Sequence, residues 1–138
     1  MRAAYRVVAS VIAVAVVLQV ASIALAGFTV ASDAEDGVTI GADYSNFGQS
    51  YHSMAGTAIG LLALVFLILS FLTDVPRGRT LAGVVVGLVV LQFVLAVVSF
   101  GTPALAVLHG INGLAIAGVA GAASRRAAAV DQAATSAA

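Results

Sequence analysis

The chain contains no cysteine and few charged residues, and both shortages narrow what it can be. Without cysteine it can form no disulfide, no iron–sulfur centre and no catalytic thiolate. Only 9% of its 138 residues are charged, against roughly 25% in a typical soluble domain. The net charge is zero and no basic patch is present, so we expect no nucleic-acid partner. There are too few polar residues to cover the surface of a water-soluble domain.

What the chain has instead is long apolar runs. Hydrophobic residues make up 62% of the sequence and gather in four runs, each near the ~20 residues that a helix needs to cross a bilayer. Backbone polar groups cannot stay unpaired in lipid, and none of the runs alternates as a membrane strand would. The first run is also longer than a signal-peptide core of about 7–15 residues, so we expect it to remain as a span. The sequence predicts an all-α, integral membrane four-helix bundle.

The expected boundaries follow from these runs and from the turn residues between them. Residues 1–126 form one transmembrane domain with helices at about 7–28, 46–73, 80–100 and 103–124, and residues 127–138 form a C-terminal tail. Ser45 is the expected N-cap of the second helix, with a start at Ser50 as the alternative. Thr102 and Pro103 form a strong start signal for the fourth helix.

The charged residues predict an orientation. All the basic residues are arginines, and they fall before the first span, between the second and third, and after the fourth: Arg2, Arg6, Arg77, Arg79, Arg125 and Arg126. The loop between the first two spans is acidic instead. The positive-inside rule therefore predicts cytoplasmic N- and C-termini.

Two short motifs occur twice. Val-Val-Leu-Gln ends at Gln19 in the first span and at Gln92 in the third, 73 residues later. His-x-x-x-Gly begins at His52 in the second span and at His109 in the fourth, 57 residues later. The spacings differ because the connection within the first helix pair is long and that within the second is short. We predict two helix pairs related as a parallel repeat, with a site at the interface between them.

The two histidines are the leading candidates for a functional site. An ionisable side chain within a membrane span needs a partner and indicates function by default. Two imidazoles in matching frames, His52 and His109, predict axial ligation of one b-type haem in the outer half of the bundle. The alternatives are interhelical hydrogen bonds, and a bare metal ion, which would need more ligands than this sequence offers nearby.

Glycines and glutamines accompany the histidines. Gly56 and Gly113 each follow a histidine by one helical turn on the same face, which leaves a flat groove either for close helix packing or for a planar macrocycle. Gln19 and Gln92 are polar residues inside spans. They are expected either to join helices by amide hydrogen bonds or to bond a haem propionate, a ligand imidazole or a substrate.

These residues resemble one half of haem A synthase, and more closely the small prokaryotic four-helix membrane proteins of that cytochrome-like type. The shared pattern is a glutamine late in the first helix (Gln19), His-x-x-x-Gly on the second (His52) and a histidine followed by Asn-Gly on the fourth (His109). The resemblance implies that His52 and His109 are axial ligands in a multi-pass protein of the prokaryotic plasma membrane. Haem A synthase has an acidic residue just before a histidine, whereas this chain has Tyr51, so oxidation of a haem methyl group is not expected.

The expected function is therefore electron transfer by a cytochrome b-like protein with one haem b per chain. Two histidine ligands leave iron no open position, which favours one-electron transfer over oxygen chemistry. The exchange partner would be a quinone or a redox partner protein, and the glycine faces also allow a homo-oligomer. Two alternatives stay open: a haem-handling or haem-modifying enzyme in which one histidine releases iron, and a non-redox scaffold or assembly subunit.

Overall fold

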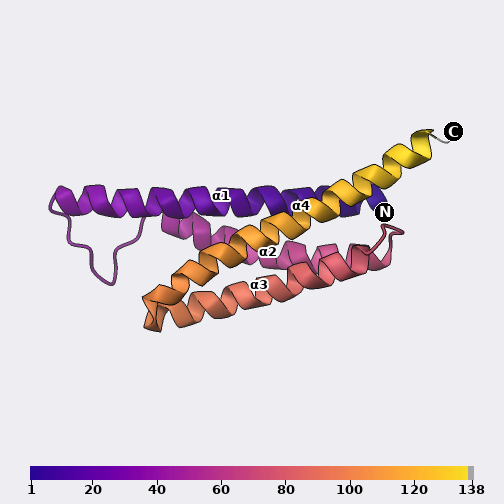
Figure 1. Cartoon of the computed structure of the whole chain (residues 1–138). Coiled ribbons are helices and arrows are strands. Elements are labelled where there is room, and N and C mark those ends of the chain that lie inside the picture. Colours follow the sequence, from indigo (N-terminus) through magenta and orange to yellow (C-terminus); the bar gives the residue numbers. More distant parts are fainter. Residues whose placement is uncertain (137–138) are drawn as a thin grey trace.

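The structure is a computed structural model that describes residues 1–136, and within that range it contains helices and no strand. The elements are α1 (Arg2–Glu35), α2 (Phe47–Phe71), α3 (Gly78–Gly101), the short 3-10 helix η1 (Pro103–Leu105) and α4 (Ala106–Ser136). Figure 1 shows them as an elongated bundle with both termini at one end. By length and composition all four long helices could cross a membrane. The predicted all-α four-helix bundle is confirmed.

Each helix packs against two neighbours. Contacts join α1 to α2, α2 to α3, α3 to α4 and α4 back to α1, whereas the diagonal pairs α1–α3 and α2–α4 do not touch along the described backbone. We call α1–α2 pair A and α3–α4 pair B. The end that holds the termini and the α2–α3 connection is the arginine end, and the opposite end, with the α1–α2 loop and η1, is the loop end.

The last helix is longer than the expected 103–124 and takes in the described part of the C-terminal segment. α4 runs without a break to Ser136, and Ala127, where the tail was expected to begin, is fully buried. Alanine is the strongest helix former and dominates this segment, and Asp131 within it binds Arg2 at 3.0 Å and Arg6 at 3.3 Å. The first helix is likewise longer at both ends than the expected 7–28, because polar residues continue its helix beyond the apolar run.

Two helix starts differ by a few residues from prediction. Asn46, not Ser45, caps α2: its side chain accepts from the Gln49 backbone N–H, and the Gln49 side chain accepts from the Asn46 N–H. The Asn46 amide also donates to the Ala26 carbonyl at 3.1 Å, which ties the cap to α1. Pro103 begins η1, and α4 follows from Ala106; the Thr102 side chain makes no capping bond there.

Small side chains recur in the core of the bundle, together with the buried rings of Tyr5 and Phe66, and many large apolar side chains lie on its outside. Alanine recurs in its core, while Phe28, Phe47, Val97 and Phe100 leave 71–93% of their surface exposed. Small interfacial residues are typical of helices that pack in lipid, where burying large apolar side chains brings no gain over leaving them in hydrocarbon. The outward apolar surface suggests a multi-pass membrane protein.

Burial follows the two spacings of the sequence repeat. The buried residues of α3 lie 73 positions after buried residues of α1: Gly78, Ala82, Val85 and Val89 correspond to Tyr5, Ala9, Ile12 and Val16. Four buried residues of α2 lie 57 positions before buried residues of α4: Ile59, Ala63, Phe66 and Ser70 correspond to Ile116, Ala120, Ala123 and Ala127. The two pairs therefore present equivalent faces to one core, which supports the repeat.

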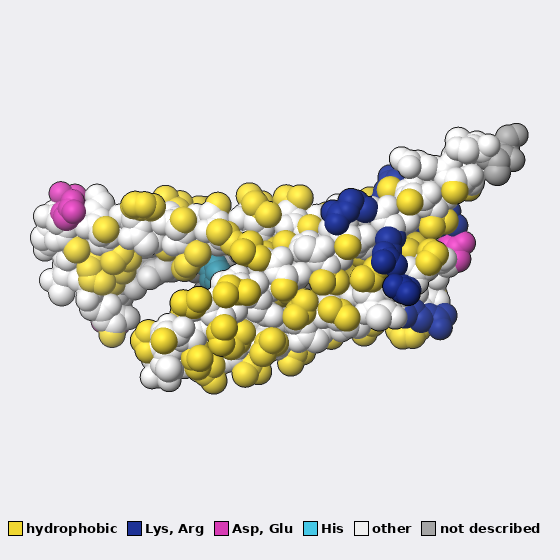
Figure 2. Space-filling model, in the orientation of Figure 1, with side chains coloured by type: hydrophobic (Ala, Val, Ile, Leu, Met, Phe, Trp, Pro, Cys, Tyr) yellow, Lys and Arg dark blue, Asp and Glu magenta, His cyan; other side chains and the backbone are white. Residues whose placement is uncertain are grey.

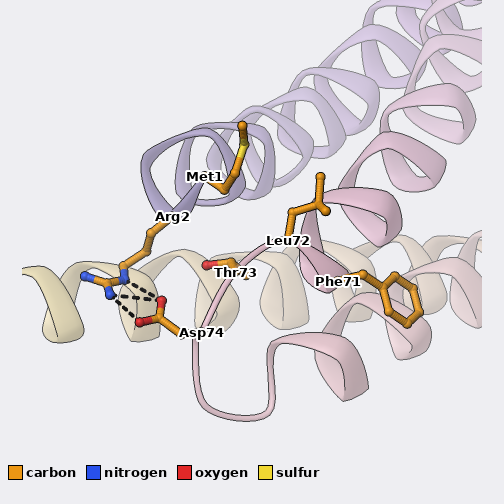
Figure 3. Close-up of a pocket in the computed structure, with 6 residues that line it drawn as sticks. All are labelled: Met1, Arg2, Phe71, Leu72, Thr73 and Asp74. Carbon is orange, nitrogen blue, oxygen red and sulfur yellow. Dashed lines mark hydrogen bonds and ion pairs between the residues drawn. The ribbon is translucent and has the colours of Figure 1, made fainter.

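At the arginine end the two pairs are tied by ion pairs. Arg2 of α1 binds Asp74 in the α2–α3 connection at 2.7 Å and Asp131 of α4 at 3.0 Å. Figure 3 shows Arg2 and Asp74 beside a shallow pocket whose other lining residues include Phe71 and Thr73. The hydrogen bond from Arg2 lowers the pKa of the Asp74 carboxyl. This end is also where the arginines gather in Figure 2, while acidic side chains mark the tip of α1 at the loop end.

Candidate functional site: two histidines between the helix pairs

The two histidines meet across the bundle although their helices do not. His52 comes from α2 and His109 from α4, which are diagonal to each other. Their ring centres are 6.1 Å apart and the ring planes are inclined by 52°. The rings are therefore close neighbours, and α2 begins at Phe47 and not at Ser50, as the matched-depth alternative requires.

The site opens toward the loop end. Both histidines are only partly buried. In Figure 2 the loop ends of pair A and pair B stand apart, and a histidine side chain is visible at the inner end of the hollow between them. A molecule entering from the loop end would reach the imidazoles between the two pairs.

In each pair a glutamine backbone carbonyl binds the histidine ring. Nδ1 of His109 lies 3.1 Å from the Gln92 carbonyl oxygen, and Nδ1 of His52 lies 3.4 Å from the Gln19 carbonyl oxygen. A carbonyl oxygen can only accept, so Nδ1 carries the proton in both rings and Nε2 keeps its lone pair. This is the arrangement in which metal-ligating histidines are usually held.

In pair B the glutamine side chain completes the anchoring of its histidine. The Gln92 amide nitrogen lies 3.0 Å from Nε2 of His109 and donates to it. The Asn112 amide donates to Gln92 Oε1 at 2.6 Å and to the Leu88 carbonyl at 2.8 Å. This chain of bonds fixes the orientation of the Gln92 amide and requires the same His109 tautomer.

Pair A has no residue that holds its glutamine side chain as Asn112 holds Gln92 in pair B. The Gln19 amide nitrogen donates to the backbone carbonyl of His52 at 2.9 Å, not to its ring. Gln19 is 7% exposed, and its Oε1 is buried without a hydrogen-bond partner among residues 1–136. The residue that corresponds to Asn112 by the 57-residue spacing is Ala55, which has no donor to offer.

The two glycines lie beside these glutamines. A Cβ added at Gly56 would lie 3.5 Å from the Gln19 amide nitrogen, and one added at Gly113 would lie 3.5 Å from that of Gln92. The space that the glycine rows were expected to leave as a flat groove is therefore filled by the amide of the partner helix. All six predicted site residues are brought together, as two matching Gln–His–Gly units.

The site offers histidine nitrogens and amides but no carboxylate. Among residues 1–136 no group of three or more His, Asp or Glu side chains is placed to hold a metal ion. The pocket of Figure 3 lies at the other end of the bundle, where Arg2 and Asp74 pair with each other and Thr73 Oγ1 is buried without a partner among residues 1–136. The arrangement can therefore bind an object that needs only two protein ligands, or it can join helices by hydrogen bonds.

Sequence reasoning missed how the histidines are anchored. The backbone carbonyls of Gln19 and Gln92 cannot be identified from residue types, because any residue at those positions offers the same oxygen. The contrast between Asn112 and Ala55 is different, because the repeat spacing places the two in register and could have revealed it.

No protein-family model, no curated protein and no solved structure matched this chain. The function is therefore inferred from the geometry of the site.

Proposed function

We propose that this chain is a multi-pass membrane haem protein in which His52 and His109 are the axial ligands of one haem b, and that it transfers single electrons. The observation that carries the proposal is the distance between the rings. A bond from a metal to an imidazole nitrogen is about 2 Å and the ring centre lies about 1 Å beyond it, so two rings on one iron have centres roughly 6 Å apart. The centres of His52 and His109 are 6.1 Å apart.

The tautomers support the same assignment. The carbonyls of Gln19 and Gln92 hold the Nδ1 protons, so that Nε2, the usual ligating nitrogen, is unprotonated in both rings. Two protein ligands suffice for iron in a porphyrin, which brings the remaining four nitrogens, but not for a bare ion. Bound in this way, haem would supply a reversible one-electron couple with no free coordination position.

The remaining site residues would position the two histidines and the glutamine side chains beside them. Gln92 would release Nε2 of His109 and stay fixed by Asn112. Gly56 and Gly113 keep the glutamine amides close to their own pair, because a larger side chain at either glycine would push the amide outward.

The orientation in the membrane is part of the proposal. The arginines at the end with both termini favour a cytoplasmic position for that end, which puts the hollow on the outer side of a prokaryotic plasma membrane. A single haem near the outer surface would exchange electrons with a quinone in the lipid bilayer or with a redox partner protein. The likeness to one half of haem A synthase supports haem as the ligand and remains part of the proposal.

One observation favours a second candidate, a non-redox scaffold or assembly subunit. Gln92 already satisfies both ring nitrogens of His109, as in a histidine that only joins helices. Such a protein would bind no haem when purified.

The deciding experiment is a reduced-minus-oxidised absorption spectrum of detergent-purified protein from cells supplied with haem precursor, with the haem content measured per chain. We expect one haem b and the sharp split band of low-spin iron. His52→Ala and His109→Ala should each abolish that band, while Ser53→Ala, on an exposed position beside His52, should keep it. A colourless wild-type protein, or a split band that survives in either histidine variant, would contradict the proposal.

A further inference from the structure

The charge of the chain is divided unequally between the two ends of the bundle. All six arginines lie at the arginine end, against two acids there, Asp74 and Asp131, which leaves an excess of four positive side chains. The other four acids lie at the loop end, between residues 33 and 43. The zero net charge of the chain therefore hides a strongly basic end, and the anions that balance this end come from outside the chain.

Most of the arginines have a contact that explains their position. The two arginines of α1 bind both acids of this end, and among residues 1–136 the other four form no ion pair. Arg79 lies over the ring of Phe71, 5.2 Å from its centre, in a cation–π contact. Arg125 lies along its own helix, since its Nη1 would be 3.3 Å from a Cβ added at Gly121. Two arginines remain, one in α4 and one in the α2–α3 connection.

The remaining arginine of α4 lines a recess between that helix and the α2–α3 connection. The recess is open, has a volume of about 370 Å³, and is lined by Arg126, Pro76, Ala129, Val130 and Ala133. Arg126 is exposed and is the only charged member of this set, so the recess joins one permanent positive charge to a small apolar wall. A guanidinium group binds phosphate through two parallel hydrogen bonds. A molecule with a phosphate beside an apolar part therefore matches the recess.

The connection carries the other arginine next to the recess. Residues 75–78 form a tight turn in which the Gly78 N–H donates to the Val75 carbonyl at 2.8 Å, and Arg77 has a φ of 60°. A turn with proline second and a positive φ third is of type II, and its third position favours glycine or asparagine. The buried Tyr5 hydroxyl donates to the Gly78 carbonyl at 3.1 Å and fixes the turn on α1. An arginine thus stands where glycine would be less strained.

We propose that this recess binds the headgroup of an anionic phospholipid, with Arg126 bonded to the phosphate and Arg77 adding positive charge beside it. The level suits a headgroup, because Arg126 follows the expected apolar run of the last span by two residues and Pro76 follows the end of α2 by five. Basic recesses between helices at the cytoplasmic side are typical sites for such lipids. The inference rests on the membrane placement within the proposed function and not on haem.

The test compares two neighbouring arginines of α4. Arg126→Gln removes the charge from the recess, and Arg125→Gln, the matched control, removes the same charge beside it. Phosphatidylglycerol, or phosphatidylcholine with the same acyl chains, is titrated into detergent-purified protein, and native mass spectrometry measures bound lipid. We expect wild type to bind phosphatidylglycerol at least about fivefold more tightly than phosphatidylcholine. Arg126→Gln should weaken phosphatidylglycerol binding about tenfold, the effect of a hydrogen bond to a charged group, and Arg125→Gln about twofold or less because salt screens its charge.

A variant of the turn separates lipid binding from folding. Arg77→Gly should weaken phosphatidylglycerol binding about fivefold, yet raise the SDS concentration that unfolds the protein, because glycine adopts the positive φ without strain. Unchanged lipid binding in this variant would overturn the role given to Arg77.

The inference as a whole is overturned by any of three results. The two lipids bind wild type equally, or Arg125→Gln and Arg126→Gln weaken phosphatidylglycerol binding equally, or millimolar inorganic phosphate displaces the lipid more than sodium chloride of the same ionic strength does. The last result would assign the recess to free phosphate. None of these measurements involves haem, so their failure leaves the ligation by His52 and His109 as proposed, and a colourless protein leaves the lipid site as proposed.

Discussion

Pair A and pair B carry the same glutamine, histidine and glycine, yet they fix the histidine differently. In pair B the ring of His109 is bonded on both sides and the amide that bonds it is locked by Asn112. In pair A the ring of His52 has one long contact, and the glutamine that could hold it has an unpaired oxygen. A repeat can thus preserve the residues of a site while varying the residue that positions them, and here the variation gives the two histidines different hydrogen bonds.

The pairs also differ in how their two helices approach at the loop end. In pair A the start of α2 touches the backbone of α1, since a Cβ at Gly48 would lie 2.5 Å from the Ser22 carbonyl oxygen and 2.6 Å from the Ala26 nitrogen. In pair B the helices are joined there by η1 and a short connection, and no such close approach is needed. The geometry of pair A therefore depends on one glycine.

The largest effect is expected from that glycine. Gly48→Ala must push α2 away from α1, and because the obstacle is backbone the free energy of unfolding should fall by about 2–3 kcal/mol. Gly27→Ala is the matched control, because nothing lies within 4 Å of its added Cβ and alanine favours the helix. Unfolding of the purified protein by added SDS, followed by circular dichroism, measures both. Equal stabilities of the two variants would show that the close approach in pair A is not required.

A smaller effect should separate the two glutamines. Gln92→Leu removes the donor to His109 and the acceptor of Asn112, so the haem-free protein should lose about 1–2 kcal/mol of stability. Gln19→Leu removes one bond, to the His52 carbonyl, but also removes the unpaired Oε1, so its net change should be close to zero. The same SDS titration compares them, and a Gln19 variant as unstable as the Gln92 variant would show that the different hydrogen bonds of the two glutamines do not affect stability.

The smallest effect concerns the arginine end, where the pairs are tied. Arg2 lowers the pKa of Asp74, so this contact contributes stability above the ordinary carboxyl pKa of about 3.9, and the contribution is lost as the pH falls through the lowered value. The Asp74 side chain is 72% exposed, so screening keeps the effect small. Spin labels on cysteines placed at Ala3 and Arg77 should report a wider distance distribution at pH 3 than at pH 7. Asp74→Asn should remove the part of that widening that is due to the Arg2–Asp74 contact. If the variant widens as much as the wild type, the widening has another cause.

Most of the fold could be predicted because long apolar runs favour long helices of matching length. The four helices, their order and the pairing by repeat all followed from the runs and from Gln19, Gln92, His52 and His109. The helix ends could not be predicted in the same way. α4 continues past Ala127 because Asp131 finds Arg2 and Arg6 across the bundle, and such a contact between distant residues leaves no local signal.

The sequence predicted which polar residues lie close together, but not their hydrogen bonds. Rare polar residues in apolar spans identified the histidines and glutamines. Their arrangement depends on backbone carbonyls and on the side of each amide that faces the ring, which only the packed helices decide. Gly56 and Gly113 were the weakest guide to the shape of the site. The space that a missing Cβ leaves is filled by whatever side chain the partner helix supplies, here Gln19 and Gln92.

Electron paramagnetic resonance of the oxidised, haem-loaded protein tests most directly whether two imidazoles share one iron. We predict a low-spin ferric signal of bis-imidazole type in wild type, and its replacement by a high-spin signal in His52→Ala. A high-spin signal in the wild-type protein, or a low-spin signal that is unchanged in His52→Ala, would contradict the ligation of one iron by His52 and His109.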